Sequence, residues 1–197
     1  MSDLIFHEQG HVYMLDGVVL PSVSELCRFL TREVYQDAPK WAMEAAAERG
    51  TAVHKAAQQL DAGGSCEIEE AYLPYLSAYK AFLNAHKVSW TLIETPMYHP
   101  ILSYAGTIDR YGLVDGKWTL VELKTSSVLQ HVLVRAQTNL YRLMLIEKDL
   151  PVEQICALHL KKEGKYRFAS VQIDEGIARS LLCLHNNLKK KRRTRNE

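Results

Sequence analysis

The chain has 197 residues, of which 47% are hydrophobic and 24% charged, with a formal net charge of +1, as expected for one globular domain with a proper core. No uninterrupted apolar run reaches the length of a membrane span, and the first residues lack the features of a signal peptide, so we expect no membrane partner. The four cysteines are scattered without a C-x-x-C pair, which argues against a disulfide framework or zinc ribbon and for a reducing, cytoplasmic location.

The first part of the chain is predicted to form short strands and then a helix. Residues 3–20 have the pattern of short strands, with turns at 8–10 and 16–17. The segment S-V-S-E at 22–25 is a capping box, in which the first serine caps the helix and the glutamate reaches back to it. It predicts a helix that continues to about Leu30.

Two further helices are predicted before the main strands. Asp37 and Pro39 mark the start of the first, as the N-cap and an early residue of the first turn. Its alanine-rich body meets Gly50 and resumes to Leu60. In the second, over 69–86, tyrosine and leucine side chains recur at helical spacing, so we expect that stripe to face the core.

The rest of the chain alternates between strands and helices. The expected elements are strands at about 89–98, 103–114 and 117–124, an amphipathic helix at 128–148, two strands around a turn at 163–164, and a helix from about Glu175. This order predicts an α/β (or α+β) fold with a mixed central β-sheet flanked by helices. We expect a single domain over 1–188, with its core at about 50–173 and an N-terminal hairpin and helix within 1–36.

The strands at 103–114 and 117–124 are predicted to form a tight hairpin. Asp-Gly at 115–116 is the favoured dipeptide for a two-residue turn, because both positions need a positive φ. That turn fixes a register in which Asp109 lies directly opposite Glu122, with Cβ atoms roughly 5 Å apart. Lys124 shares their face by strand alternation, and the residues on either side of Glu122 point into the core.

Two carboxylates facing each other need compensation. At about 4 Å they repel by about 4 kcal/mol at an effective dielectric constant of 20. Either one carboxyl group stays protonated or a cation lies between them. A hard divalent cation with oxygen ligands, such as Mg²⁺, fits this arrangement best. The alternative is an exposed hairpin in which Lys124 forms an ordinary salt bridge with Glu122 or Asp109.

The C-terminal residues 189–197 carry six positive charges and one negative charge, which leaves a net charge of −4 on the rest of the chain. A basic tail on a mildly acidic body fits a nucleic-acid partner. The alternative is the solvated end of a helix, where cations are favoured by the helix dipole. The side chains predicted to contact phosphates are Lys189, Lys190, Lys191, Arg192, Arg193 and Arg195.

One further motif suggests a different enzyme class. The segment from His7 to His11 matches the H-E-x-x-H pattern of zinc proteases, whose mechanism needs both histidines on one face of a helix. Gly10 interrupts the segment and its flanks have strand character, so we expect no zinc site there.

Four weak motifs together form a stronger pattern. In chain order they are Gly50-x-x-x-His54, Gly106-Thr-Ile-Asp109, Glu122-Leu-Lys124 and Gln137-x-x-x-Tyr141. In this order, spacing and placement on a helix, a hairpin and a following helix, the chain resembles the PD-(D/E)XK nuclease superfamily and its RecB-like branch. The resemblance covers about 50–141 and implies a restriction-endonuclease-like core. The N-terminal hairpin with Leu-Pro-Ser-Val-Ser at 20–24 is similar to the phage-associated exonucleases of this group.

The resemblance implies a metal centre and a set of catalytic residues. The implied metal ligands are the imidazole of His54, the carboxylates of Asp109 and Glu122, and the backbone carbonyl of Leu123. Asp109 and Glu122 thereby belong to the catalytic set, with Lys124 acting on the attacking water and the phosphate, and Gln137 and Tyr141 positioning substrate near Lys124. The implied cofactor is Mg²⁺, with Mn²⁺ a plausible substitute because one ligand is an imidazole. The cysteines do not match the iron–sulfur members of the family, so we expect no cluster. Glu94, on the strand before the hairpin, is interpreted as an edge charge within reach of the site.

The function implied is hydrolysis of DNA phosphodiester bonds by a metal-dependent nuclease. An exonuclease of phage-type recombination or DNA processing is favoured, because RecB-like members mostly work from DNA ends. Two alternatives stay open: a structure- or sequence-specific endonuclease on the same core, and a non-catalytic nucleic-acid-binding relative. DNA is the expected partner, and the resemblance leaves room for a phage single-strand annealing or DNA-binding protein and for a homo-oligomer.

Overall fold

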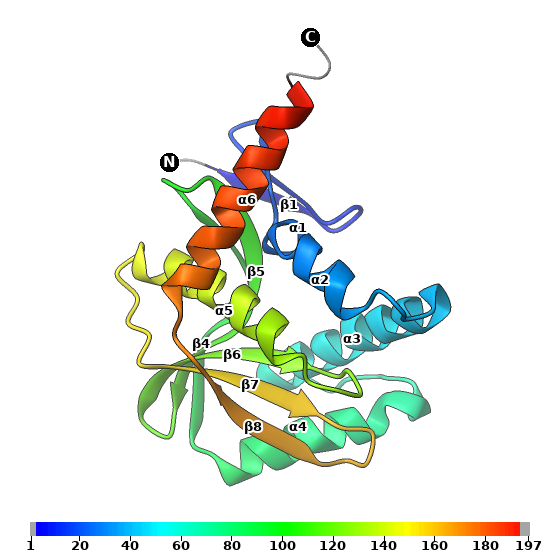
Figure 1. Cartoon of the computed structure of the whole chain (residues 1–197). Coiled ribbons are helices and arrows are strands. Elements are labelled where there is room, and N and C mark those ends of the chain that lie inside the picture. The colour runs from blue at the N-terminus through cyan, green and yellow to red at the C-terminus, as the bar shows by residue number, and fades with distance from the viewer. Residues whose placement is uncertain (1–2, 194–197) are drawn as a thin grey trace.

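A five-stranded mixed β-sheet forms the centre of the molecule (Figure 1). The computed structural model describes residues 3–193, and side chains through Lys189. The strands lie in the order β4-β5-β6-β7-β8, where β6 and β7 run parallel and the other neighbours antiparallel. Their bounds are β4 Val88–His99, β5 Tyr104–Val114, β6 Lys117–Lys124, β7 Gln154–Leu160 and β8 Tyr166–Val171.

Helices cover both faces of this sheet, which confirms the predicted α/β class. Their bounds are α1 Val23–Leu26, α2 Arg28–Val34, α3 Lys40–Asp61, η1 Glu70–Tyr72, α4 Leu73–Ala85, α5 His131–Ile146 and α6 Glu175–Arg193. α3 and α4 pack on one face, around Tyr79 and Phe82, while α5, α6 and α1 pack on the other, around Leu140 and Met144. Successive side chains of β6 point to opposite faces of the sheet, so Leu120 packs with α5 and Val121 packs with α3 and α4.

The N-terminal segment forms a separate three-stranded sheet of β1 Leu4–His7, β2 Val12–Leu15 and β3 Val18–Leu20, as predicted. Tyr13, at its centre, is almost fully buried. The turn between β1 and β2 contains His11 at a φ of 53°, so the H-E-x-x-H segment is not helical and cannot present both histidines as a zinc protease does.

Ser22 is the N-cap that the predicted capping box requires, but the helix boundaries after it differ from the prediction. Ser22 Oγ accepts a hydrogen bond of 3.0 Å from the backbone N–H of Glu25. The helix then divides at Cys27 into α1 and α2, and α2 ends at Val34 rather than near Leu30.

The prediction that Asp37 caps the next helix is wrong. α3 begins at Lys40 after Pro39, which occupies the N-cap position and whose side chain makes no capping hydrogen bond. The helix continues through Gly50 without interruption, because the packing of Val53 and Ala57 against α4 outweighs the roughly 1 kcal/mol by which glycine disfavours a helix.

The central hairpin has the predicted turn and register. Asp115 and Gly116 adopt φ values of 51° and 81°, and the ladder of β5 and β6 starts with Val114 paired to Lys117. It ends at the pair Arg110–Val121, one position before the predicted pair of carboxylates.

α6 runs through Arg193 and extends beyond the sheet, past the small N-terminal sheet (Figure 1). The basic segment therefore continues this helix at least to that point. Lys189 is exposed, whereas the side chains of residues 190–193 and the whole of Arg195 lie outside the described residues. Among the helices within residues 3–193, none combines the length and apolar character needed to cross a bilayer.

Candidate active site

Three neighbouring strands place one carboxylate each at the same level of the sheet. Glu94 comes from β4, Asp109 from β5 and Glu122 from β6. The pairs flanking Glu94 in the β4–β5 ladder, Ile93–Arg110 and Thr95–Ile108, leave Glu94 facing Asp109. Asp109 and Glu122 come directly after the last pair of the β5–β6 ladder, Arg110–Val121, counted away from the turn. They therefore lie next to each other where the two strands separate.

The end of the β5–β6 ladder decides where the carboxylate of Asp109 points. Its Oδ2 atom accepts a hydrogen bond of 2.8 Å from the backbone N–H of Leu123. A side-chain oxygen therefore takes the place that a backbone carbonyl would have in a continuing ladder. Leu123 is thus held against Asp109 through its N–H, and a metal-binding role for its carbonyl stays a prediction. Asp109 is only 7% exposed, so this carboxylate is buried rather than displayed on a hairpin surface.

Glu94 has an unusual backbone conformation. Its φ is 43°, a value that non-glycine residues rarely adopt and that concentrates at functional sites. Its side chain is 18% exposed and its Oε1 atom lies 3.0 Å from Nδ1 of His54. Glu94 is therefore not an ordinary edge charge, whereas the expectation that it lies within reach of the site agrees with its contact with His54.

His54, Glu94 and Asp109 form a compact group of potential metal ligands. His54 lies on α3, and its Nδ1 atom is also 3.6 Å from Oδ1 of Asp109. One ligand atom from each residue lies within 4.8 Å of the others. One imidazole nitrogen and two carboxylate oxygens suit Mn²⁺ or Mg²⁺.

Glu122 lies beside this group and has a free oxygen. Its Oε1 atom accepts a hydrogen bond of 2.7 Å from Nζ of Lys124, but Oε2 is buried without a partner among the described residues. Glu122 is only 1% exposed. A buried carboxylate oxygen without a donor is costly, and a cation is the partner that would satisfy it. The donor set and this unpaired oxygen therefore both fit a divalent cation.

The remaining predicted residues are brought together on the same side of β6. Nζ of Lys124 donates to Oε1 of Gln137 at 3.0 Å, and Nε2 of Gln137 donates to the Tyr141 hydroxyl at 3.4 Å. Gln137 and Tyr141 share one face of α5 at a spacing of four residues, as predicted. The close approach of Tyr141 to β5 requires Gly106: a Cβ atom there would lie 2.6 Å from Cε1 of Tyr141.

A buried arginine supports Glu94 from behind. Nη1 of Arg110 donates to Oε1 of Glu94 at 2.8 Å, and Nε donates to Oδ2 of Asp61 at 2.7 Å. The Tyr79 hydroxyl donates to Asp61 at 2.8 Å. Arg110 and Asp61 are essentially fully buried, at 0% and 2% side-chain exposure. No local sequence pattern indicates this group of Arg110, Asp61 and Tyr79, because their contact joins α3, α4 and β5.

The pKa values of the site reflect burial and crowding. Burial, followed by repulsion from Glu122, raises the pKa of Asp109 to about 7. Burial lowers the pKa of His54, but the charge of Asp109 and the hydrogen bond to Glu94 outweigh burial and raise that pKa to about 9. For Glu94, burial is outweighed by the hydrogen bond and charge of His54 and by Arg110, so its pKa is lowered. The protonation of each of these groups therefore depends on the charge of its neighbours in the site.

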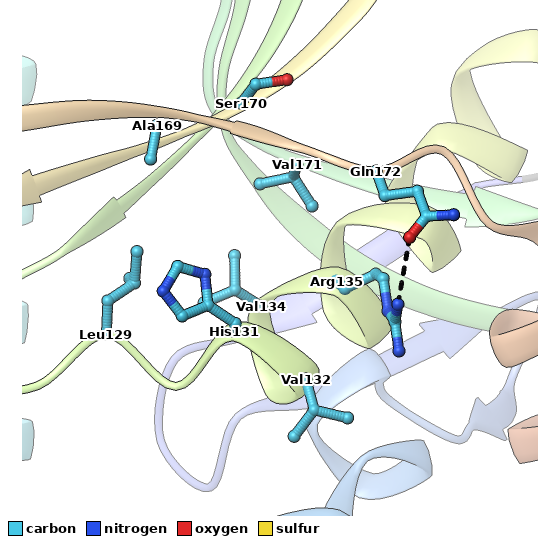
Figure 2. A pocket seen from close by; sticks show the side chains of 9 residues that line it. All are labelled: Leu129, His131, Val132, Val134, Arg135, Ala169, Ser170, Val171 and Gln172. Atoms are coloured by element: carbon cyan, nitrogen blue, oxygen red, sulfur yellow. Dashed lines mark hydrogen bonds between the residues drawn. The ribbon is translucent and has the colours of Figure 1, made fainter.

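Two cavities lie outside this group. One of about 380 Å³ lies between the first turns of α5 and β8 (Figure 2). Its wall is mostly apolar, Arg135 bonds to Gln172 across it at 3.2 Å, and none of the predicted site residues lines it. The other, of about 440 Å³, lies between α2 and the start of α3.

No family model matches the chain, and no curated protein matches it either. The assignment of a function therefore rests on the geometry of the site.

Proposed function

We propose that this protein is a divalent-metal-dependent nuclease with a restriction-endonuclease-like core of the RecB-like type. The observation that carries the proposal is the convergence of Glu94, Asp109 and Glu122, from three adjacent strands, with His54 on one side and Lys124 on the other. Buried carboxylates in such number lower stability unless a cation accompanies them.

The residues divide into two chemical roles. His54, Glu94, Asp109 and Glu122 offer one nitrogen and several oxygens for Mg²⁺ or Mn²⁺. A bound cation of this kind lowers the pKa of a water molecule and offsets the charge that develops on a phosphate. Lys124 presents an ammonium group beside these carboxylates, held in place by Glu122 and Gln137.

Lys124 is placed to attract a phosphate oxygen and to orient an attacking water. Its Nζ atom is fixed by two hydrogen bonds, so little reorganisation is needed when substrate arrives. Gln137 orients Lys124 on one side and bonds to Tyr141 on the other. These contacts give Gln137 and Tyr141 a positioning role toward Lys124 and the substrate.

DNA is the proposed substrate, and an exonuclease of phage-type recombination or DNA processing is the proposed activity. The test incubates the protein with end-labelled linear duplex, closed circular plasmid, single-stranded DNA and RNA, each with Mg²⁺, Mn²⁺ or EDTA. We expect loss of linear DNA in Mg²⁺ or Mn²⁺, persistence of the circle, and no reaction in EDTA. Discrete fragments from the circle would favour an endonuclease, and preferential loss of RNA would change the substrate class.

Site variants separate this activity from a contaminating nuclease. Glu122→Gln and Lys124→Ala are expected to abolish cleavage. Glu8→Gln and Lys117→Ala make the same chemical changes at exposed positions outside the site and should cleave as the wild type does. Binding without cleavage by the wild-type protein under every metal condition would reject the nuclease and support a non-catalytic nucleic-acid-binding protein.

A further inference from the structure

A groove between α2 and the beginning of α3 carries an excess of positive charge. We call it the α2–α3 groove; it has a volume of about 440 Å³. Its walls are formed by Arg28, Thr31, Arg32, Tyr35, Gln36, Ala38, Lys40 and Met43. Three of these side chains are cationic and none is anionic, although the chain without its C-terminal segment is mildly acidic.

The two arginines of the groove are available to a ligand. Arg28 and Arg32 are exposed, and neither forms a salt bridge with a residue that the structure describes. They lie four residues apart on α2 and therefore on the same face of that helix. Lys40, by contrast, is paired with Glu44 at 3.3 Å across exposed surface, where such a pair contributes little.

Both walls of the groove belong to helices that also reach the candidate active site. α2 contacts α5, the helix that carries Gln137, and α3 carries His54 about three to four turns beyond the groove. Burial raises the pKa of the Cys27 thiol, at the start of α2, to about 12. The charges of Glu122 and Lys124 also act on this thiol, so the start of α2 lies close to the site. The groove is thus connected to the candidate site through α2 and α3.

Exposed aromatic side chains lie next to these cations in the sequence, just outside the groove lining. Trp41, next to Lys40 on the first turn of α3, is 72% exposed, and Phe29, next to Arg28, is 54% exposed. Tyr35 lines the groove itself. Cationic side chains that follow a backbone, interleaved with aromatic rings on which bases stack, are typical of proteins that bind single-stranded nucleic acid.

The burial of the site also favours a single strand. Asp109 and Glu122 are 7% and 1% exposed, so a phosphate must enter the site to reach them. A flexible single strand can bend its backbone inward, whereas a rigid duplex presents phosphates only from its outer surface. We propose that the α2–α3 groove binds a single-stranded stretch of nucleic acid and leads its backbone to the candidate active site. The claim that the strand leads to the active site rests on the proposed nuclease function, whereas the claim that the groove binds a single strand does not.

The test measures binding in EDTA, so that hydrolysis plays no part. The probe is a fluorescein-labelled 15-nucleotide oligothymidylate, followed by anisotropy over a series of salt concentrations. The variant is Arg28→Ala/Arg32→Ala, and the matched control is Lys80→Ala/Lys117→Ala, which removes two exposed cations from α4 and the start of β6. Melting curves establish that each variant is folded.

We expect the arginine variant to bind roughly tenfold more weakly and its log–log salt slope to fall by about 1.4, since each phosphate contact with a single strand contributes about 0.7. Trp41→Ala should weaken binding by about five- to a hundredfold without changing the slope, because stacking involves no counterion. The control variant should bind as the wild type does.

Three results would overturn the inference. They are an unchanged slope in the arginine variant, equal loss of affinity in the control, and displacement of the probe as effectively by polyglutamate as by unlabelled oligothymidylate. Failure of the proposed function looks different. If the wild-type protein binds the probe through Arg28 and Arg32 but cleaves nothing with Mg²⁺ or Mn²⁺, the binding role of the groove is supported and the proposed nuclease function is rejected.

Discussion

Replacing Asp109 by asparagine is expected to make the metal-free protein more stable. The substitution keeps an oxygen that can accept the hydrogen bond from Leu123 N–H and removes a charge that lies between Glu94 and Glu122. Burial and repulsion from Glu122 raise the pKa of Asp109 from an ordinary value of 3.8 to about 7, so the ionised form is disfavoured in the folded state.

The magnitude follows from linkage between protonation and folding. A group whose pKa is raised on folding stabilises the protein most below its unfolded pKa, and that stability is lost as the pH rises through its folded pKa. For Asp109 the window runs from 3.8 to about 7, and the loss across it has an upper limit of about 4 kcal/mol. At about 2–4 °C per kcal/mol for a chain of this size, and with some relaxation of neighbouring charges, Asp109→Asn should melt roughly 5–10 °C higher at pH 8.

The assay is thermal melting in EDTA from pH 4 to pH 8, repeated with saturating Mn²⁺. The advantage of Asp109→Asn should be small at pH 4, grow to pH 7 and then level off. With metal at a hundred times its dissociation constant the wild type gains about 2.7 kcal/mol, and the variant should gain much less. Asp115→Asn, at the hairpin turn, is the control: the hydrogen bond from His86 lowers the pKa of Asp115, so this change should not raise stability. If Asp109→Asn melts below the wild type at pH 8 in EDTA, the charge of Asp109 does not destabilise the metal-free protein, and the prediction is refuted.

Three further predictions concern the ligands, the packing and the basic segment. His54→Ala and Glu94→Gln should each raise the half-saturating metal concentration for cleavage about tenfold or more, and an unchanged value would reject that residue as a ligand. Gly106→Ala forces a Cβ against Tyr141 and should lower the free energy of unfolding by about 1–3 kcal/mol in urea titrations; a neutral result would mean that α5 can shift. Deleting residues 189–197 should reduce the salt slope for duplex binding by up to about 5 while maximal turnover stays the same, and an identical slope would identify the segment as a solvated helix end.

The parts of the site that were predictable from sequence are those set by local geometry. The turn at 115–116 fixes the hairpin register, because Asp-Gly adopts the positive φ values that a two-residue turn needs. Helical spacing alone places Gln137 and Tyr141 on one face of α5. The mixed sheet also followed from the order of strands and helices along the chain.

The unpredicted parts depend on contacts between distant segments. Glu94 lies opposite Asp109 with a positive φ, a conformation that a glutamate does not signal in a sequence. The β4–β5 ladder also shifts register between Trp90 and Leu92, so counting along the strand does not give its pairing. Arg110 pairs with Asp61, which lies 49 residues away in the sequence on α3, and no local pattern predicts such a pair.

The stability of the metal-free site bears on the choice between a nuclease and a non-catalytic binding protein. Arg110 forms ion pairs with Glu94 and, on its other side, with Asp61. Lys124 forms an ion pair with one oxygen of Glu122. The second oxygen of Glu122 remains unpaired among the described residues, and Asp109 is pushed toward protonation by burial and Glu122 although His54 lies 3.6 Å away. A protein that only held nucleic acid would gain stability from an amide at either position and would bind phosphates better with fewer buried negative charges. These incompletely compensated carboxylates have a physical reason to be present if a divalent cation joins them, and that reason supports a metal-dependent reaction over binding alone.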